Sequence, residues 1–119
     1  MKPEELKRRT KKFSLEVIKL VGALPNTRIA DLFERQLVRS ATSVGANYRA
    51  ACRARSQADF ISKIGVVEEE ADESAYWLEL LLETKIMNDS VARSLLVEAD
   101  ELTAIFTASG RTAKRGRGR

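Results

Sequence analysis

The stretch Ser56–Leu82, which reads SQADFISKIGVVEEEADESAYWLELLL, decides the fold of this chain. Its apolar and small positions recur in steps of four and three residues, the spacing of a helix that packs along a seam. Those positions are Phe60, Ile64, Val67, Ala71, Ser74, Leu78 and Leu81. Ser56 and Asp59 form a capping box, because each side chain can accept a backbone N–H of the first turn. One such helix is not stable alone, so the stretch predicts further helices around it.

Three other segments show a similar periodicity. We expect helices over residues 4–24, 27–53 and 56–86, and a fourth that begins after Asn88 or Asp89 and ends at Ser109–Gly110. The apolar stripes of the other three are Leu6, Phe13, Val17, Leu20 and Leu24, then Ile29, Phe33, Leu37, Ser40, Val44, Asn47 and Ala51, then Val91, Leu95, Ala99, Leu102 and Phe106. The small residues around Gly45 predict a close crossing with another helix.

The short links between these helices favour antiparallel neighbours. The predicted fold class is therefore all-α, an up-down-up-down antiparallel four-helix bundle over residues 1–110. Residues 111–119 have no apolar residue larger than Ala and five basic ones, so they are expected to be a disordered basic tail.

The composition excludes several functional classes. The 119 residues contain no histidine and a single cysteine, Cys52, which removes the usual general base, most zinc and di-iron sites and any internal disulfide. Glu69, Glu70 and Glu73 could hold Mg²⁺, but a solvated or salt-bridged face is the favoured interpretation. No signal peptide or membrane span is visible, so we expect a cytoplasmic protein without a cofactor.

Charge is segregated along the chain. Residues 1–55 carry a net charge of +8, residues 56–110 carry −9, and residues 111–119 carry +5. Arginine and lysine match phosphate oxygens, so the basic segments are candidates for nucleic-acid binding. The candidate residues are Lys7, Arg8, Lys11, Lys12, Arg28, Arg35, Arg39, Arg49, Arg53, Arg111, Lys114, Arg115, Arg117 and Arg119.

A second interpretation of the five arginines of the second helix is purely structural. Their shared face could pair with an acidic stripe on the third helix, within the subunit or between subunits. That stripe is Glu68, Asp72, Glu79 and Glu83. The sequence leaves both interpretations open.

A few other residues are expected to be structural. Asn47 lies on an apolar stripe, so we expect its amide to bond across to Glu70 or Glu73 and fix the helix register. Trp77 falls near the seam, where packing is favoured over stacking on a ligand. Ser56 and Asp59 complete this group as the cap of the third helix.

Two runs of residues resemble a known family. Arg35–Ala50, which reads RQLVRSATSVGANYRA, and Glu70–Leu80, which reads EADESAYWLEL, are similar to the second and third helices of the bacterial four helix bundle proteins, also called 23S rRNA-intervening sequence proteins. The resemblance covers about residues 24–88. It implies a ring-forming bundle, typically a pentamer, without known catalytic activity. The family is similar to the accessory protein of diversity-generating retroelements, which implies RNA or DNA and a reverse transcriptase as partners.

The sequence therefore favours a non-enzymatic homo-oligomer that associates with RNA or DNA through its basic surfaces. We expect binding to weaken with salt and on deletion of residues 111–119. The alternative is a protein-interaction scaffold with no affinity for nucleic acid, in which the arginines only make salt bridges. A metal-dependent nuclease has the carboxylates it needs but no recognisable site.

Overall fold

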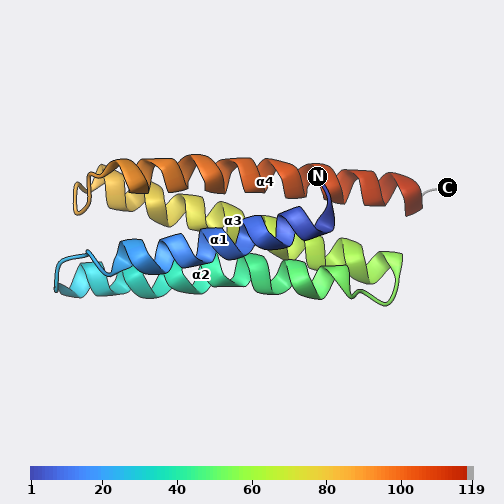
Figure 1. The fold of residues 1–119 in the computed structure, drawn as a ribbon, viewed down its shortest axis with the longest axis horizontal. Coiled ribbons are helices and arrows are strands. Elements are labelled where there is room, and N and C mark those ends of the chain that lie inside the picture. Colours follow the sequence, from blue (N-terminus) through green and yellow to red (C-terminus); the bar gives the residue numbers. More distant parts are fainter. Residues whose placement is uncertain (118–119) are drawn as a thin grey trace.

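The computed structural model describes residues 1–117, which form four helices and no strand. The helices are α1 (Pro3–Val21), α2 (Arg28–Cys52), α3 (Gln57–Glu83) and α4 (Ser90–Arg117). Neighbours in sequence are antiparallel, and α1 also contacts α4, which closes the bundle (Figure 1). The predicted up-down-up-down four-helix bundle is thus confirmed, as an elongated body of 52 × 23 × 20 Å.

The predicted stripes supply most of the core. On α3, every stripe residue from Ile64 to Leu81 is buried, and Phe60 is half-buried. Ile29 and Val91, at the starts of the α2 and α4 stripes, are instead exposed. Each lies in the first turn of its helix, at the end of the bundle. The 4-3 pattern therefore located the core correctly except at the helix ends and at Asn47 of α2, which is half-buried.

The helix starts follow the predicted capping chemistry. The Ser56 hydroxyl accepts the N–H of Asp59 at 3.0 Å, and the Asp59 carboxylate accepts the N–H of Arg55 at 3.2 Å. At α4, Asp89 is the cap, since its carboxylate accepts the N–H groups of Val91 and Ala92. These caps satisfy backbone donors that have no partner inside the helix.

The C-terminal end of α3 differs from the prediction. The helix ends at Glu83, three residues before Ile86, because Lys85 adopts a left-handed conformation with φ 61°. The N–H of Lys85 donates to the carbonyl of Leu82, which closes the last turn.

The predicted disordered tail is wrong for residues 111–117. α4 does not stop at Gly110 but continues to Arg117, beyond the first turn of α1 (Figure 1). Ala113 is buried there, and its carbonyl accepts a hydrogen bond from the Gln57 amide at 2.9 Å. Packing against the start of α3 therefore holds a segment whose composition alone favours disorder. Residues 118–119 lie outside the described residues.

Candidate nucleic-acid interface

A basic groove runs between α1 and α2. Four of the candidate cations line it, namely Lys7, Arg8, Lys11 and Arg49, and its volume is about 490 Å³. Between the cations lie small side chains, which are Ser14, Thr42, Gly45 and Ala46. The groove therefore combines a positive rim with a floor that a phosphate backbone can approach closely.

Close contact between α1 and α2 forms the floor of this groove. A Cβ atom built on Gly45 would lie 3.4 Å from the Thr10 hydroxyl, and the Ser14 hydroxyl donates to the Ala41 carbonyl at 2.9 Å. Thr10 is fully buried and satisfies its own hydroxyl with the Leu6 carbonyl. The close crossing predicted from the small residues is thus between α2 and α1.

Most charges of the groove are not neutralised by the protein. Within residues 1–117, Arg8, Lys11 and Arg49 have no ion pair, and Lys7 pairs only with Glu4, at 3.3 Å. The Glu4 side chain is 74% exposed, so this pair is weak and readily exchanged. The groove therefore keeps a net positive potential toward solvent.

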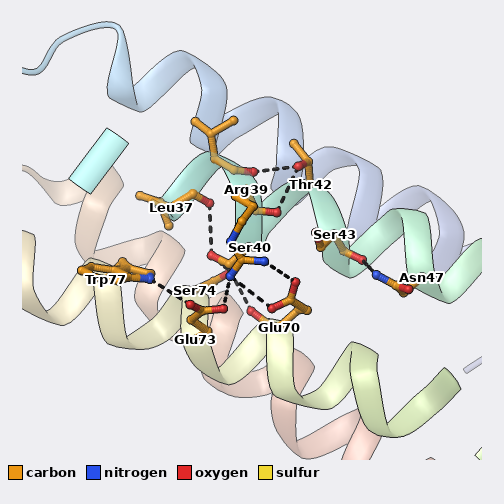
Figure 2. Close-up of polar contacts among 11 residues, drawn as sticks. Leu37, Arg39, Ser40, Thr42, Ser43, Asn47, Glu70, Glu73, Ser74 and Trp77 are labelled. Carbon is orange, nitrogen blue, oxygen red and sulfur yellow. Dashed lines mark hydrogen bonds and ion pairs between the residues drawn. The ribbon is translucent and has the colours of Figure 1, made fainter. Parts of the chain in front are cut away.

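Arg39 has a structural role instead. Its guanidinium bonds to Glu70 at 2.8 Å and also to Glu73, so it joins α2 to α3 (Figure 2). This agrees with the salt-bridge interpretation for one arginine, but the partners are not the predicted stripe of Glu68, Asp72, Glu79 and Glu83. Among the residues that the structure describes, Arg28, Arg35, Arg49 and Arg53 pair with no carboxylate. All four are exposed.

The prediction for Asn47 is wrong. Its amide donates to the Ser43 carbonyl of its own helix at 2.8 Å and does not reach Glu70 or Glu73 (Figure 2). The polar link in the core is made by Ser40 and Ser74, both fully buried, whose hydroxyls lie 2.9 Å apart.

Glu73 connects this network to the aromatic side chains. Burial is the largest single influence on the pKa of Glu73 and raises it, but the hydrogen bonds with Arg39, Glu70 and the Trp77 indole and the charge of Arg39 together outweigh burial, so the pKa is lowered overall. The hydrogen bonds that Arg39 donates to the carboxylates of Glu70 and Glu73 raise the pKa of Arg39. The Trp77 ring packs against Phe33, with ring centres 5.9 Å apart, which agrees with the packing role expected for Trp77.

Besides Lys7, two other cations of α1 contact carboxylates. Arg9 bonds to Glu98 through two nitrogens at 2.7 Å and to Glu101 at 2.7 Å, which fastens α1 to α4. Lys12 lies 3.7 Å from Glu16 of its own helix. Arg9 is therefore structural, and the groove cations are those that turn toward α2.

The C-terminal turns of α4 carry further cations. Arg111, Lys114 and Arg115 are exposed on the helix that Gln57 and Ala113 hold in place. Arg117 is the last residue of α4, and Arg119 lies beyond the described residues. The C-terminal end of α4 lies at the same end of the bundle as the α2–α3 link (Figure 1).

The structure adds residues that the sequence analysis did not select. Arg55 and Lys63 line a depression beside Arg53 at the α2–α3 link, and Tyr48 and Phe60 line a neighbouring one. The sequence places Arg55 outside any helical stripe, so periodicity could not assign it to a surface. Only the fold of the link brings it next to α1.

Two properties of residues 1–117 bear on other functions. No helix there combines the length and the apolar character needed to cross a lipid bilayer. No three Asp, Glu or Cys side chains gather there in a group that could hold a metal ion.

The comparisons with known proteins agree with the fold. A crystal structure of a protein with unknown function from the S23 ribosomal protein family of Bacteroides thetaiotaomicron VPI-5482 is similar, with a TM-score of 0.84 and 32% identity. The likeness covers 93% of this chain and 99% of that one. No curated protein matches the chain. A family model described as 23S rRNA-intervening sequence protein matches residues 4–108. The chain therefore belongs to the 23S rRNA-intervening sequence protein family.

Proposed function

We propose that this protein is a non-enzymatic, self-associating bundle that binds the phosphate backbone of RNA or DNA along the basic groove. The observation that carries the proposal is the contrast between two sets of cations. Arg9 and Arg39 are held by carboxylates of the neighbouring helices, whereas Arg8, Lys11 and Arg49 converge on one groove without such partners in the described chain. Unneutralised cations that converge on one groove are what phosphate contacts require.

The distribution of charge along the bundle supports the same surface. The half that contains the α2–α3 link, formed by residues 1–12, 41–70 and 104–117, carries fourteen basic and six acidic groups. The other half, residues 13–40 and 71–103, carries six basic and eleven acidic groups. A polyanion is therefore attracted to the half that holds the basic groove.

The test measures binding of a fluorescent RNA hairpin by anisotropy at about 50 and about 200 mM KCl. The variant Arg8→Glu/Lys11→Glu/Arg49→Glu should weaken binding about tenfold or more at the lower salt. The control Lys19→Glu/Lys85→Glu/Arg93→Glu changes the net charge equally at the other end and should retain most of the affinity.

Two outcomes would contradict the proposal. Equal losses in both triple variants would mean that only net charge matters and that the groove is not a site. If the unmodified protein does not bind at the lower salt, the protein-interaction scaffold is the better account.

Self-association has its own support. Seven large apolar side chains distributed over all four helices are exposed, namely Leu15, Ile18, Ile29, Val66, Tyr76, Val91 and Val97. The resemblance in the second and third helices implies a pentameric ring, and we propose that assembly here. Light scattering should give five times the protomer mass, and a mass that stays at one protomer would refute the assembly but not the groove.

A further inference from the structure

The basic groove continues into a second depression at the end of the bundle. This end depression, of about 640 Å³, lies where the α2–α3 link meets the start of α1. It shares Glu4 and Lys7 with the basic groove, and it shares Arg55 with the depression lined by Arg53 and Lys63. A strand whose phosphates follow the groove therefore passes Lys7 on its way to the end depression, where Arg55 is the next cation.

The lining of the end depression differs from that of the groove. It contains two aromatic rings, those of Tyr48 and Phe60, together with Pro3, Ala51 and Ala54. Tyr48 is only 5% exposed and packs against Phe106 of α4, with ring centres 5.3 Å apart. Phe60 is half-buried, although it belongs to the apolar stripe of α3. Part of the lining is therefore apolar and aromatic, beside the polar residues Ser56 and Gln57, and the core holds Tyr48 in place.

The Tyr48 hydroxyl gives this apolar surface a polar group. The hydroxyl lies beside the Cys52 thiol, and both residues line the depression. Burial, followed by the neighbouring Cys52 thiol, raises the pKa of Tyr48, so the phenol is neutral and can donate its proton in a hydrogen bond.

Cations at the end depression indicate that its ligand is negatively charged. Arg55 has no ion pair within residues 1–117, and the only ion-pair partner of Lys7 is the exposed Glu4. Aromatic rings, a hydroxyl donor and adjacent cations together match a nucleotide, whose base has a flat face, polar edges and a phosphate beside it. The volume also lies within the range of about 300–1,000 Å³ usual for small-ligand sites.

We propose that the end depression takes an unpaired base of a nucleic-acid strand whose phosphates lie along the basic groove. This inference rests on the proposed function. A base in a duplex is stacked on both faces and paired along its edge, so it cannot enter. The protein should therefore prefer single strands, or duplexes with an unpaired end, over blunt duplexes.

The first test uses Cys52, the single cysteine of the chain, as a reporter. Its side chain is exposed and lines the end depression. In the unmodified protein, a saturating single-stranded RNA octamer should slow alkylation of Cys52 by iodoacetamide several-fold, whereas a blunt duplex of the same sequence should not. Adenosine monophosphate at millimolar concentration should protect weakly, because it lacks the phosphates that fill the groove.

The second test replaces the aromatic ring of Phe60. Phe60→Leu should weaken binding of the single-stranded octamer about tenfold, because stacking on an aromatic ring is lost, and should leave the blunt duplex unaffected. Phe60→Tyr keeps a ring and should retain the affinity. Leu82→Val trims a half-buried apolar side chain at the other end of α3 and serves as the matched control.

The outcomes separate this inference from the proposed function. If both RNAs bind equally and Cys52 reacts at the same rate with either, the groove stands and the base site is refuted. Protection by the mononucleotide as strong as by the octamer would also refute the strand-linked site. If the unmodified protein binds neither RNA at low salt, the proposed function fails and this inference fails with it.

Discussion

At the residue scale, two glycines in helices differ in what surrounds them. A Cβ atom on Gly65 would have no other heavy atom within 4 Å, whereas one on Gly45 would touch Thr10 of α1 at ordinary contact distance. Gly45 therefore marks the crossing of α1 and α2 but leaves room for one methyl group. Nothing in the structure explains Gly65.

These glycines give a stability prediction. Gly65→Ala and Gly45→Ala should each raise the free energy of unfolding by up to about 1 kcal/mol, because alanine is the better helix former. Gly45→Leu should lower it by about 1–3 kcal/mol, because the longer side chain would overlap Thr10. Urea unfolding followed by circular dichroism measures all three. A loss of stability in Gly45→Ala would show that the crossing is tighter than described.

Glu73 gives a prediction for how the stability of the fold depends on pH. Its pKa is lowered in the folded protein, so its contribution to stability is present above the unfolded value of about 4.3 and is lost as pH falls through the lower folded value. Glu73→Gln should cost less than about 1 kcal/mol at neutral pH, since the pair is partly exposed. Thermal melts should show this difference vanishing at acidic pH. Glu69→Gln, on the same helix, should behave as the unmodified protein at every pH.

At the element scale, the end of α4 depends on contacts with α3. Residues 111–117 have a composition that favours disorder, but Ala113 is buried and Gln57 donates to its carbonyl. The helix therefore continues because of a partner that lies 56 residues away in the sequence. This contact sets the positions of Arg111, Lys114 and Arg115.

Removal of that contact should loosen the segment. In Gln57→Ala, amide hydrogens of residues 111–117 should exchange faster by about fivefold, corresponding to the loss of one hydrogen bond of about 1 kcal/mol. Exchange in α2 should not change. Gln36→Ala, the other glutamine of the chain, is the control, and equal effects of the two changes would contradict the role of Gln57.

The sequence predicted the elements better than the contacts between them. Spacing of apolar residues located the four helices, and Ser56, Asp59 and Asp89 marked two of their starts, because those signals lie within one or two turns. Asn47 was assigned the wrong partner, and the carboxylates that bind Arg39 were missed, since these depend on the rotation of α2 against α3. The end depression lies where the α2–α3 link meets the start of α1, and periodicity carries no information on such a junction.

At the scale of the whole molecule, the bundle is polarised along its length. Basic groups concentrate in the half with the α2–α3 link, while acidic groups concentrate in the other half. Helices that run antiparallel bring the start of α1 and the end of α4 to the same half (Figure 1). The fold thereby gathers charges that the sequence keeps in three separate segments.

This uneven distribution of charge gives a prediction for how nucleic-acid binding depends on salt concentration. The logarithm of the binding constant should fall linearly with the logarithm of KCl concentration, and Arg8→Ala should reduce the slope by about one. Lys85→Ala, at the acidic half, should leave the slope unchanged. Anisotropy titrations at several salt concentrations measure both. An unaltered slope for Arg8→Ala would mean that Arg8 does not contact a phosphate.

The position of the two chain ends has a practical consequence for any fusion protein. Pro3 lines the end depression, and α4 finishes beside the same region. An affinity tag at either terminus would therefore emerge next to the surface where the ligand is proposed to bind, and a tag rich in acidic residues would compete with the phosphates for its cations. A tag inserted in the turn at Thr84–Asp89 would project from the opposite end and leave that surface open.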